Sequence, residues 1–255
     1  MRIFRIEHRG AAYYASASGT AELELFHGAP WAGGRPTGER VALASVRLLA
    51  PVTPSKIVCV GRNYAAHAQE LGNDVPSEPL LFLKPPSSLL GPESEIVLPT
   101  ASQRVEHEAE IGIVIGRQLT NASPEQGVAG VFGVTCVNDV TARDLQRKEV
   151  QFTRAKGYDT FCPVGPWIET GLSLGELHVT GRVNGQIRQQ APVSQMVFSI
   201  AQLISFISTV MTLEPGDLIA TGTPAGVGPL VAGDVVEIEV SGVGVLRNRV
   251  ATPGR

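Results

Sequence analysis

The segment VEHEAEIGIVIG, Val105 to Gly116, joins three acidic residues to an apolar run of strand-like composition. In a strand, residues two apart share a face, so Glu106, Glu108 and Glu110 would stand in one row. Two carboxylates about 4 Å apart repel each other by roughly 4 kcal/mol at an effective dielectric constant near 20. Either the row faces water, or a divalent cation compensates its charge. Oxygen ligands alone favour Mg²⁺, Mn²⁺ or Ca²⁺ over Zn²⁺.

The segments on either side of this strand are also mostly short strands. Period-2 alternation or short apolar runs mark KIVCVG, VFGVTCVND, LHVTGRVNG, DLIATG, DVVEIEV and VGVLRNRV. Helices are few: Ser199 is a candidate N-cap for a helix from Ile200 to Met211, and a shorter helix from Ala65 to Leu71 ends at Gly72. Strands and helices do not alternate regularly, which argues against Rossmann and TIM-barrel folds. We therefore predict an α+β fold that is mostly β.

The N-terminal part of the chain differs in character from the rest. It contains three short strands, RIFRIEH, AAYYAS and AELELFHG, separated by turns that contain glycine. Its few apolar residues are insufficient for an independent core, so we expect it to pack on the larger part. We predict a small N-terminal β-rich domain at residues 1–50 and a larger domain at residues 51–255.

Charge and composition exclude several classes of function. The formal net charge is −3 and the pI is about 6.0, whereas proteins that bind phosphate backbones are usually basic, so we expect no nucleic-acid partner. No apolar run approaches the roughly 20 residues of a membrane-spanning helix, and no usual signal peptide is present. We expect a cytoplasmic protein with no membrane partner. The three cysteines, Cys59, Cys136 and Cys162, form no C-x-x-C pair and are predicted to be buried, reduced thiols.

Other polar residues occur at the ends of the predicted elements. Asp139 ends the apolar strand VFGVTCVND and can either bind a metal or cap the following turn. His67 and Glu70 share a face of the short helix, where they form a base with its orienting carboxylate or two exposed polar residues. The Gly-rich segment TGTPAGVGPL can present backbone N–H groups to an anion or act as a structural loop. It lacks the ending of a P-loop.

The order of these segments resembles that of the fumarylacetoacetate hydrolase family. The strings that carry the resemblance are GRNYAAHAQELG, LLFLKPPSSL, VEHEAEIGIVIG, VNDVTARDLQRKE, AKGYDTFCPVGPWI, VNGQ and TGTPAGVG. They cover roughly Val52 to Val250, and the first 50 residues resemble a small N-terminal extension of some bacterial members. The resemblance implies a mixed β-sandwich roll of the family's C-terminal-domain type and a homodimer.

The resemblance also implies a metal site. Glu108, Glu110 and Asp139 match the family's three metal-ligand carboxylates, which hold Mg²⁺, with Mn²⁺ as the alternative. Glu106 falls outside this ligand set and is expected to be structural or to lie behind the ligands. Lys84, in FLKPP, matches a family string without an implied catalytic role.

Catalytic and substrate-binding positions follow from the same resemblance. Lys156 matches the active-site lysine. His67 and Glu70 match a catalytic pair carried on a lid that orders over bound substrate. The positions that match residues lining the substrate site are Arg143, Gln146 and Thr223.

The implied activity is that of a magnesium-dependent enzyme acting on a small 2-oxo acid through a metal-bound enolate. Hydrolytic C–C cleavage, decarboxylation and isomerisation all pass through that enolate. We expect a 2-hydroxyhepta-2,4-diene-1,7-dioate isomerase or decarboxylase of aromatic catabolism. An acylpyruvate hydrolase and an oxaloacetate decarboxylase are the close alternatives.

Two other classes of function compete with this interpretation. A metal-dependent nuclease also uses strand-borne acidic residues, but it requires an E-x-K string beside them and a basic surface. A non-catalytic binding protein on the same fold would lack a residue of the ligand set or of the His–Glu pair, and all of these residues are present.

Overall fold

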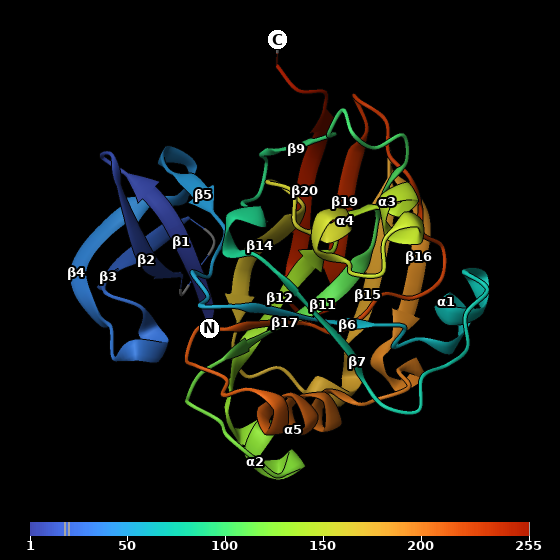
Figure 1. The fold of residues 1–255 in the computed structure, drawn as a ribbon. Coiled ribbons are helices and arrows are strands. Elements are labelled where there is room, and N and C mark those ends of the chain that lie inside the picture. The colour runs from blue at the N-terminus through green and yellow to red at the C-terminus, as the bar shows by residue number, and fades with distance from the viewer. Residues whose placement is uncertain (18, 20, 255) are drawn as a thin grey trace.

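The computed structural model describes residues 1–17, 19 and 21–254, and in this part of the chain strands predominate over helices (Figure 1). The strands are β1 (Arg2–His8), β2 (Ala11–Ala17), β3 (Glu22–His27), β4 (Arg35–Ala42), β5 (Arg47–Leu49), β6 (Ile57–Gly61), β7 (Leu80–Lys84), β8 (Leu89–Leu90), β9 (Glu95–Val97), β10 (Val105–His107), β11 (Ala109–Ile115), β12 (Val131–Asn138), β13 (Thr141–Ala142), β14 (Cys162–Glu169), β15 (His178–Val183), β16 (Gln186–Pro192), β17 (Leu218–Ala220), β18 (Gly228–Pro229), β19 (Val235–Val240) and β20 (Gly244–Ala251). The α-helices are α1 (Ala65–Glu70), α2 (Pro124–Ala129), α3 (Arg143–Lys148), α4 (Thr153–Lys156) and α5 (Ile200–Val210).

The largest sheet runs through the middle of the molecule. Its strand order is β4-β3-β2-β1-β14-β12-β11-β17-β6-β7, with β5 joined to β1 and β8 to β14. Strand β11 is buried along its whole length from Ala109 to Ile115, because other layers cover both of its faces. The apolar half of VEHEAEIGIVIG is therefore a central strand.

A second sheet, β16-β15-β19-β20-β9, packs against the centre of the first and makes the sandwich. In β19 the alternation of apolar and polar residues predicts which side chains are buried. The even-numbered residues from Val236 to Val240 are buried, and the two glutamates between them are half-buried. The buried side chains join Ile111 and Ile113 of β11 in one apolar core. The predicted α+β, mostly β class is confirmed.

Helices α5 and α2 lie side by side at one end of this core (Figure 1). Each begins with a capping box, in which the serine before the helix accepts the N–H of a glutamine three residues on. In α5 that serine is Ser199, as predicted. A Cβ atom at Gly127 of α2 would lie 2.9 Å from Ile204 of α5, so glycine allows the two helices to pack closely.

The N-terminal strands β1–β5 continue the large sheet. Strand β1 pairs antiparallel with β14, with Ile3 opposite Ile168. The apolar side chains of these strands form their own cluster, against which Trp167 of β14 packs. The division of the chain at residue 50 stays a prediction.

The three cysteines are free and buried, as predicted. Burial raises the pKa of Cys136 and of Cys162 to about 12, so these thiols stay protonated. Within the described residues, no helix has both the length and the apolar character needed to cross a membrane.

Candidate metal and substrate site

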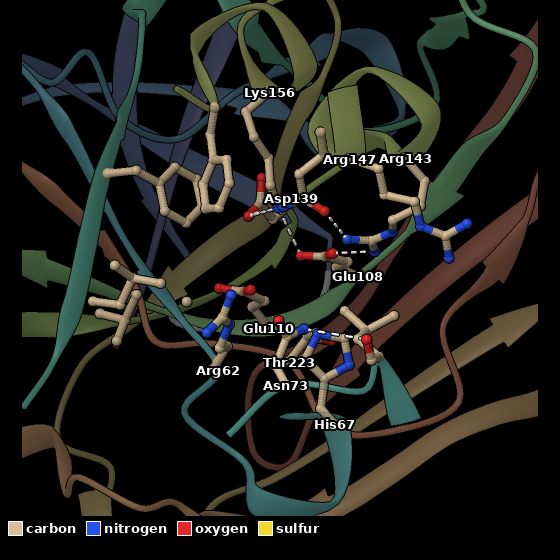
Figure 2. A pocket seen from close by; sticks show the side chains of 17 residues that line it. Arg62, His67, Asn73, Glu108, Glu110, Asp139, Arg143, Arg147, Lys156 and Thr223 are labelled. Carbon is tan, nitrogen blue, oxygen red and sulfur yellow. Dashed lines mark hydrogen bonds and ion pairs between the residues drawn. The ribbon is translucent and has the colours of Figure 1, made fainter. Parts of the chain in front are cut away.

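Three carboxylates meet where neighbouring strands begin and end. Glu110 is the second residue of β11, Glu108 lies just before that strand, and Asp139 follows β12. Strands β11 and β12 pair antiparallel with Ala109 opposite Asn138, so the start of one lies beside the end of the other. One oxygen from each carboxylate lies within 4.8 Å of the others, and the three residues are at most 4% exposed (Figure 2). This is the cluster that the resemblance implied.

The three glutamates of VEHEAEIGIVIG do not form one row, so that expectation was wrong. The strand is interrupted at Glu108: β10 joins a small sheet with β13 and β18, whereas β11 belongs to the large sheet. Glu106 accepts hydrogen bonds from Arg104 Nε at 2.6 Å and Arg143 Nε at 2.7 Å and is not part of the cluster. The period-2 rule fails here because the chain changes sheets between the first glutamate and the third.

A buried glutamine holds the interruption in place. Gln189 Oε1 accepts the backbone N–H of Ala109 at 2.9 Å and lies 3.0 Å from His107 Nδ1. Its Nε2 donates to Thr223 Oγ1 and to the carbonyl of Pro224, both at 2.7 Å. One side chain therefore ties the two residues that flank the first ligand carboxylate to the loop that carries Thr223.

We expect Gln189→Leu to destabilise the protein by about 2–4 kcal/mol, because buried polar groups on both sides lose their partner. It should also weaken binding of a divalent cation, because Glu108 loses its support. Chemical denaturation and a calorimetric metal titration measure the two effects. The control is Gln190→Leu at the exposed neighbouring position. A folded Gln189→Leu variant with unchanged metal affinity would contradict the prediction.

Two buried lysines pair with the carboxylate cluster. Lys156, the last residue of α4, donates from Nζ to Glu108 at 2.8 Å and to Asp139 at 2.6 Å. Lys84, at the end of β7, donates to the other oxygen of Asp139 at 2.7 Å and to the carbonyl of Val140 at 3.2 Å. Lys84 is 1% exposed. It is therefore a partner of a ligand carboxylate, a role that the sequence did not indicate.

Arg143 orders the other side of the cluster. This residue begins α3 and is 2% exposed. Its guanidinium donates to Glu106, Glu108 and Gln146. Because its Nε, Nη1 and Nη2 atoms each donate to a protein group, Arg143 fixes the carboxylates of Glu106 and Glu108 in place.

The carboxylates differ in how their charge is compensated. Burial raises the pKa of Glu108, but the charges of Lys156 and Arg143 outweigh burial and hold that pKa well below its usual range. Burial and the two neighbouring carboxylates raise the pKa of Glu110 well above its usual range. Glu110 accepts the N–H of Gly222 at 2.9 Å and forms no ion pair with any described residue. Three carboxylates supply oxygen ligands, and one of them, Glu110, has no cationic partner among the described residues. Both features fit a site for a divalent cation.

The predicted His–Glu pair lies at the same place. His67 of α1 is 5% exposed, and its Nδ1 lies 3.2 Å from Glu70 Oε2. Glu70 Oε1 accepts the N–H of Gly226 at 2.9 Å. Two backbone N–H groups of the Gly-rich loop, at Gly222 and Gly226, thus bind carboxylates of the protein itself, at Glu110 and Glu70. The loop holds these side chains in place.

These residues line one pocket (Figure 2). Eight of the nine predicted site residues line it, and the ninth, Glu70, contacts it through His67. Its volume of about 200 Å³ is below the roughly 300–1,000 Å³ of pockets for drug-sized ligands. Such a pocket accommodates a small organic acid. The catalytic and binding roles assigned to these residues stay predictions.

Sequence reasoning named Lys84 without giving it a role, and it missed two other buried polar residues near the site, Gln189 and Asn63. Gln189 has no local marker, because the residues on both sides of it in β16 are exposed. Asn63, fully buried, bonds the carbonyls of Phe198 and Thr221, and it too has no marker.

Comparison with known protein families decides the assignment. Residues 56–251 match the fumarylacetoacetate (FAA) hydrolase C-terminal family, which accounts for more than half of the chain. The chain belongs to the fumarylacetoacetate hydrolase family. Residues 1–51 match a second family, described as Rv2993c-like, N-terminal. The resemblance inferred from the sequence is confirmed, and the protein is an enzyme of this family.

Three relatives show what this family member is similar to. Protein Rv2993c of Mycobacterium tuberculosis is 46% identical over 264 residues, which cover 100% of both chains. The mitochondrial oxaloacetate decarboxylase of Dictyostelium discoideum is 46% identical over 198 residues, 75% of this chain and 91% of that protein. A crystal structure of 2-hydroxyhepta-2,4-diene-1,7-dioate isomerase from Mycobacterium marinum has a TM-score of 0.92 and 43% identity, and the match covers 100% of both chains. The names of the second and third describe different reactions, so these relatives support the family without selecting a reaction.

Proposed function

We propose that this enzyme acts on a small 2-oxo acid with Mg²⁺ held by Glu108, Glu110 and Asp139. Its proposed activity is that of a 2-hydroxyhepta-2,4-diene-1,7-dioate isomerase or decarboxylase in aromatic catabolism. The observation that carries the proposal is the buried carboxylate cluster with an uncompensated Glu110, in one pocket with Lys156 and His67. The likeness to the M. marinum isomerase supports the reaction type. Mn²⁺ prefers the same oxygen ligands and is the alternative cation.

Bound Mg²⁺ supplies a Lewis acid that favours formation of an enolate from a 2-oxo acid. Burial lowers the pKa of Lys156, but Asp139 and Glu108 outweigh burial and raise that pKa above its usual value. Lys156 therefore stays a cation, which stabilises negative charge that develops on the substrate oxygen. A lysine held in this state cannot act as a base.

Proton transfer then falls to His67. Its imidazole lines the pocket, and Glu70 orients the ring through Nδ1, which leaves Nε2 for a proton at C3 of the substrate or for a water molecule. Glu70 is itself fixed by the N–H of Gly226. Arg143, Gln146 and Thr223 complete the proposed set as substrate-binding residues.

Two other reactions and one other class remain as alternatives. Oxaloacetate decarboxylation is favoured by the D. discoideum relative. Acylpyruvate hydrolysis uses the same enolate chemistry with water as the nucleophile. A non-catalytic binding protein on this fold would bind the acid without turnover.

The test is a spectrophotometric screen with 2-hydroxyhepta-2,4-diene-1,7-dioate, oxaloacetate and acetylpyruvate, each with Mg²⁺ and with EDTA. We expect turnover that requires the metal and is lost in Glu108→Ala. We expect His67→Gln to keep Mg²⁺ binding and to lose about 10²- to 10⁴-fold in turnover, the usual contribution of a general acid or base.

The matched control is Glu95→Ala, at an exposed glutamate outside the pocket, which should behave as the unmodified protein. Failure to bind any divalent cation in a calorimetric titration would overturn the proposal. Binding of all three acids with no turnover would favour the non-catalytic alternative. The expected homodimer and cytoplasmic location stay predictions, and sedimentation analysis tests the first of them.

A further inference from the structure

The charges that line the pocket are unequal. Four basic residues, Arg62, Arg143, Arg147 and Lys156, and the three carboxylates of the cluster line it. Arg143 and Lys156 are engaged with Glu108 in buried ion pairs. With a divalent cation also bound, the pocket-lining side chains and the cation together carry more positive than negative charge. One carboxylate of a ligand is not enough to balance this excess. The pocket therefore favours a ligand with more than one negative charge.

Arg62 is a basic pocket residue that, like Arg147, forms no ion pair within the described part of the chain. It directly follows β6, is half-buried, and makes no ion pair or side-chain hydrogen bond with any of the described residues. A half-buried guanidinium without a partner loses hydration and gains no hydrogen bond in return. Figure 2 shows its side chain on the Glu110 side of the pocket, across from Arg143 and Lys156.

The backbone of Arg62 is in an uncommon conformation. Its φ is 57°, in the left-handed region that costs free energy for a residue other than glycine. The next residue, Asn63, holds the segment there through three side-chain hydrogen bonds: to the carbonyls of Phe198 and Thr221, at 3.1 and 2.8 Å, and from the N–H of Phe198 at 2.8 Å. The fold thus fixes the position from which Arg62 extends into the pocket.

Apolar side chains also line this pocket, at Val60, Leu71, Leu80, Phe82 and Phe152. They can contact the carbon chain of a ligand but cannot pair a charge. A planar guanidinium binds a carboxylate through two parallel hydrogen bonds. A ligand with one carboxylate at the cation, a carbon chain on these apolar residues and a second carboxylate at Arg62 satisfies all three features.

We propose that Arg62 binds the second carboxylate of a dicarboxylic 2-oxo acid and so selects dicarboxylic over monocarboxylic substrates. This inference rests on the proposed function, because it places the first carboxylate at the cation. Arg147, the other free pocket arginine, is exposed on α3, so water screens its charge.

The test measures binding of two matched pairs of acids to the magnesium-loaded protein by calorimetry. 2-Oxoglutarate is compared with 2-oxopentanoate, and 2-oxoadipate with 2-oxohexanoate, so that each pair differs by a carboxylate in place of a methyl group. In the better-fitting pair we expect the dicarboxylate to bind on the order of 10- to 100-fold more tightly, the range for a hydrogen bond to a charged group. Arg62→Gln should remove that preference without weakening the monocarboxylate.

Two further variants complete the experiment. Arg62→Lys should keep part of the preference, because it keeps the charge but not the two parallel hydrogen bonds. Arg147→Gln should keep most of it. Equal affinity within both pairs, or a preference that survives Arg62→Gln, would overturn the inference while monocarboxylate binding leaves the proposed function standing. If none of the four acids binds, the proposed function itself fails.

Discussion

Glu110→Gln should abolish tight magnesium binding and lower turnover on the order of 10³-fold, yet leave the metal-free protein at least as stable as before. Glutamine has nearly the same shape and keeps an acceptor for the N–H of Gly222. Burial and the two neighbouring carboxylates disfavour the ionised form of Glu110, and glutamine stays neutral at every pH. The lost Lewis-acid contribution amounts to several kcal/mol of transition-state stabilisation, which accounts for the fall in turnover. Calorimetric magnesium titration and thermal unfolding with and without the metal measure the effects.

The control for this variant is the same substitution four residues earlier. Glu106 is also buried but is paired with Arg104 and Arg143, which together outweigh burial and lower its pKa. Glu106→Gln should therefore destabilise the metal-free protein. Unchanged magnesium affinity in Glu110→Gln, or a loss of metal-free stability as large as in Glu106→Gln, would contradict our account of the cluster.

Lys84→Met should destabilise the protein by about 3–5 kcal/mol, because it removes one partner of a fully buried ion pair and leaves Asp139 under-compensated. For a chain of this size, that loss lowers the melting temperature by roughly 6–20 °C. The magnesium affinity should also fall, because Asp139 is no longer held at both of its oxygens. Differential scanning calorimetry and a metal titration provide the two readouts.

The exposed Lys148, which has no ion pair in the described part of the chain, provides the matched substitution Lys148→Met. It should shift the melting temperature by no more than about 1–2 °C, as for most surface changes. If Lys84→Met unfolds at the same temperature as Lys148→Met, then Lys84 has no structural role at the cluster. The two substitutions are chemically identical, so the difference between them isolates burial and pairing.

Local patterns were sufficient for most of the secondary structure. The alternation in β19 predicted which of its residues are buried, and Ser199 predicted the start of α5. Both succeed because each depends on residues that are only two or three positions apart in the chain. The same reasoning failed at Glu108, where the chain leaves one sheet for another within two residues.

The site was predictable in its carboxylates but not in the residues that hold them. Acidic residues within an apolar strand are unusual enough to stand out, and the family resemblance supplied the third ligand, Asp139. Gln189 and Arg62 carry no such mark, because their neighbours in the chain are unremarkable. Their positions at the site arise from contacts with residues that are distant in the chain.

By itself the sequence determined the mostly β class, the family and the buried carboxylates, since these depend on composition, short-range period and ordered motifs. Only the tertiary structure decided which charges meet. It paired Lys84 with Asp139, divided Glu106 from Glu108 and Glu110, and left Glu110 without an ion pair among the described residues. The physical reason is that electrostatic and hydrogen-bonding energies depend on distance in space, and pairing between remote strands sets those distances.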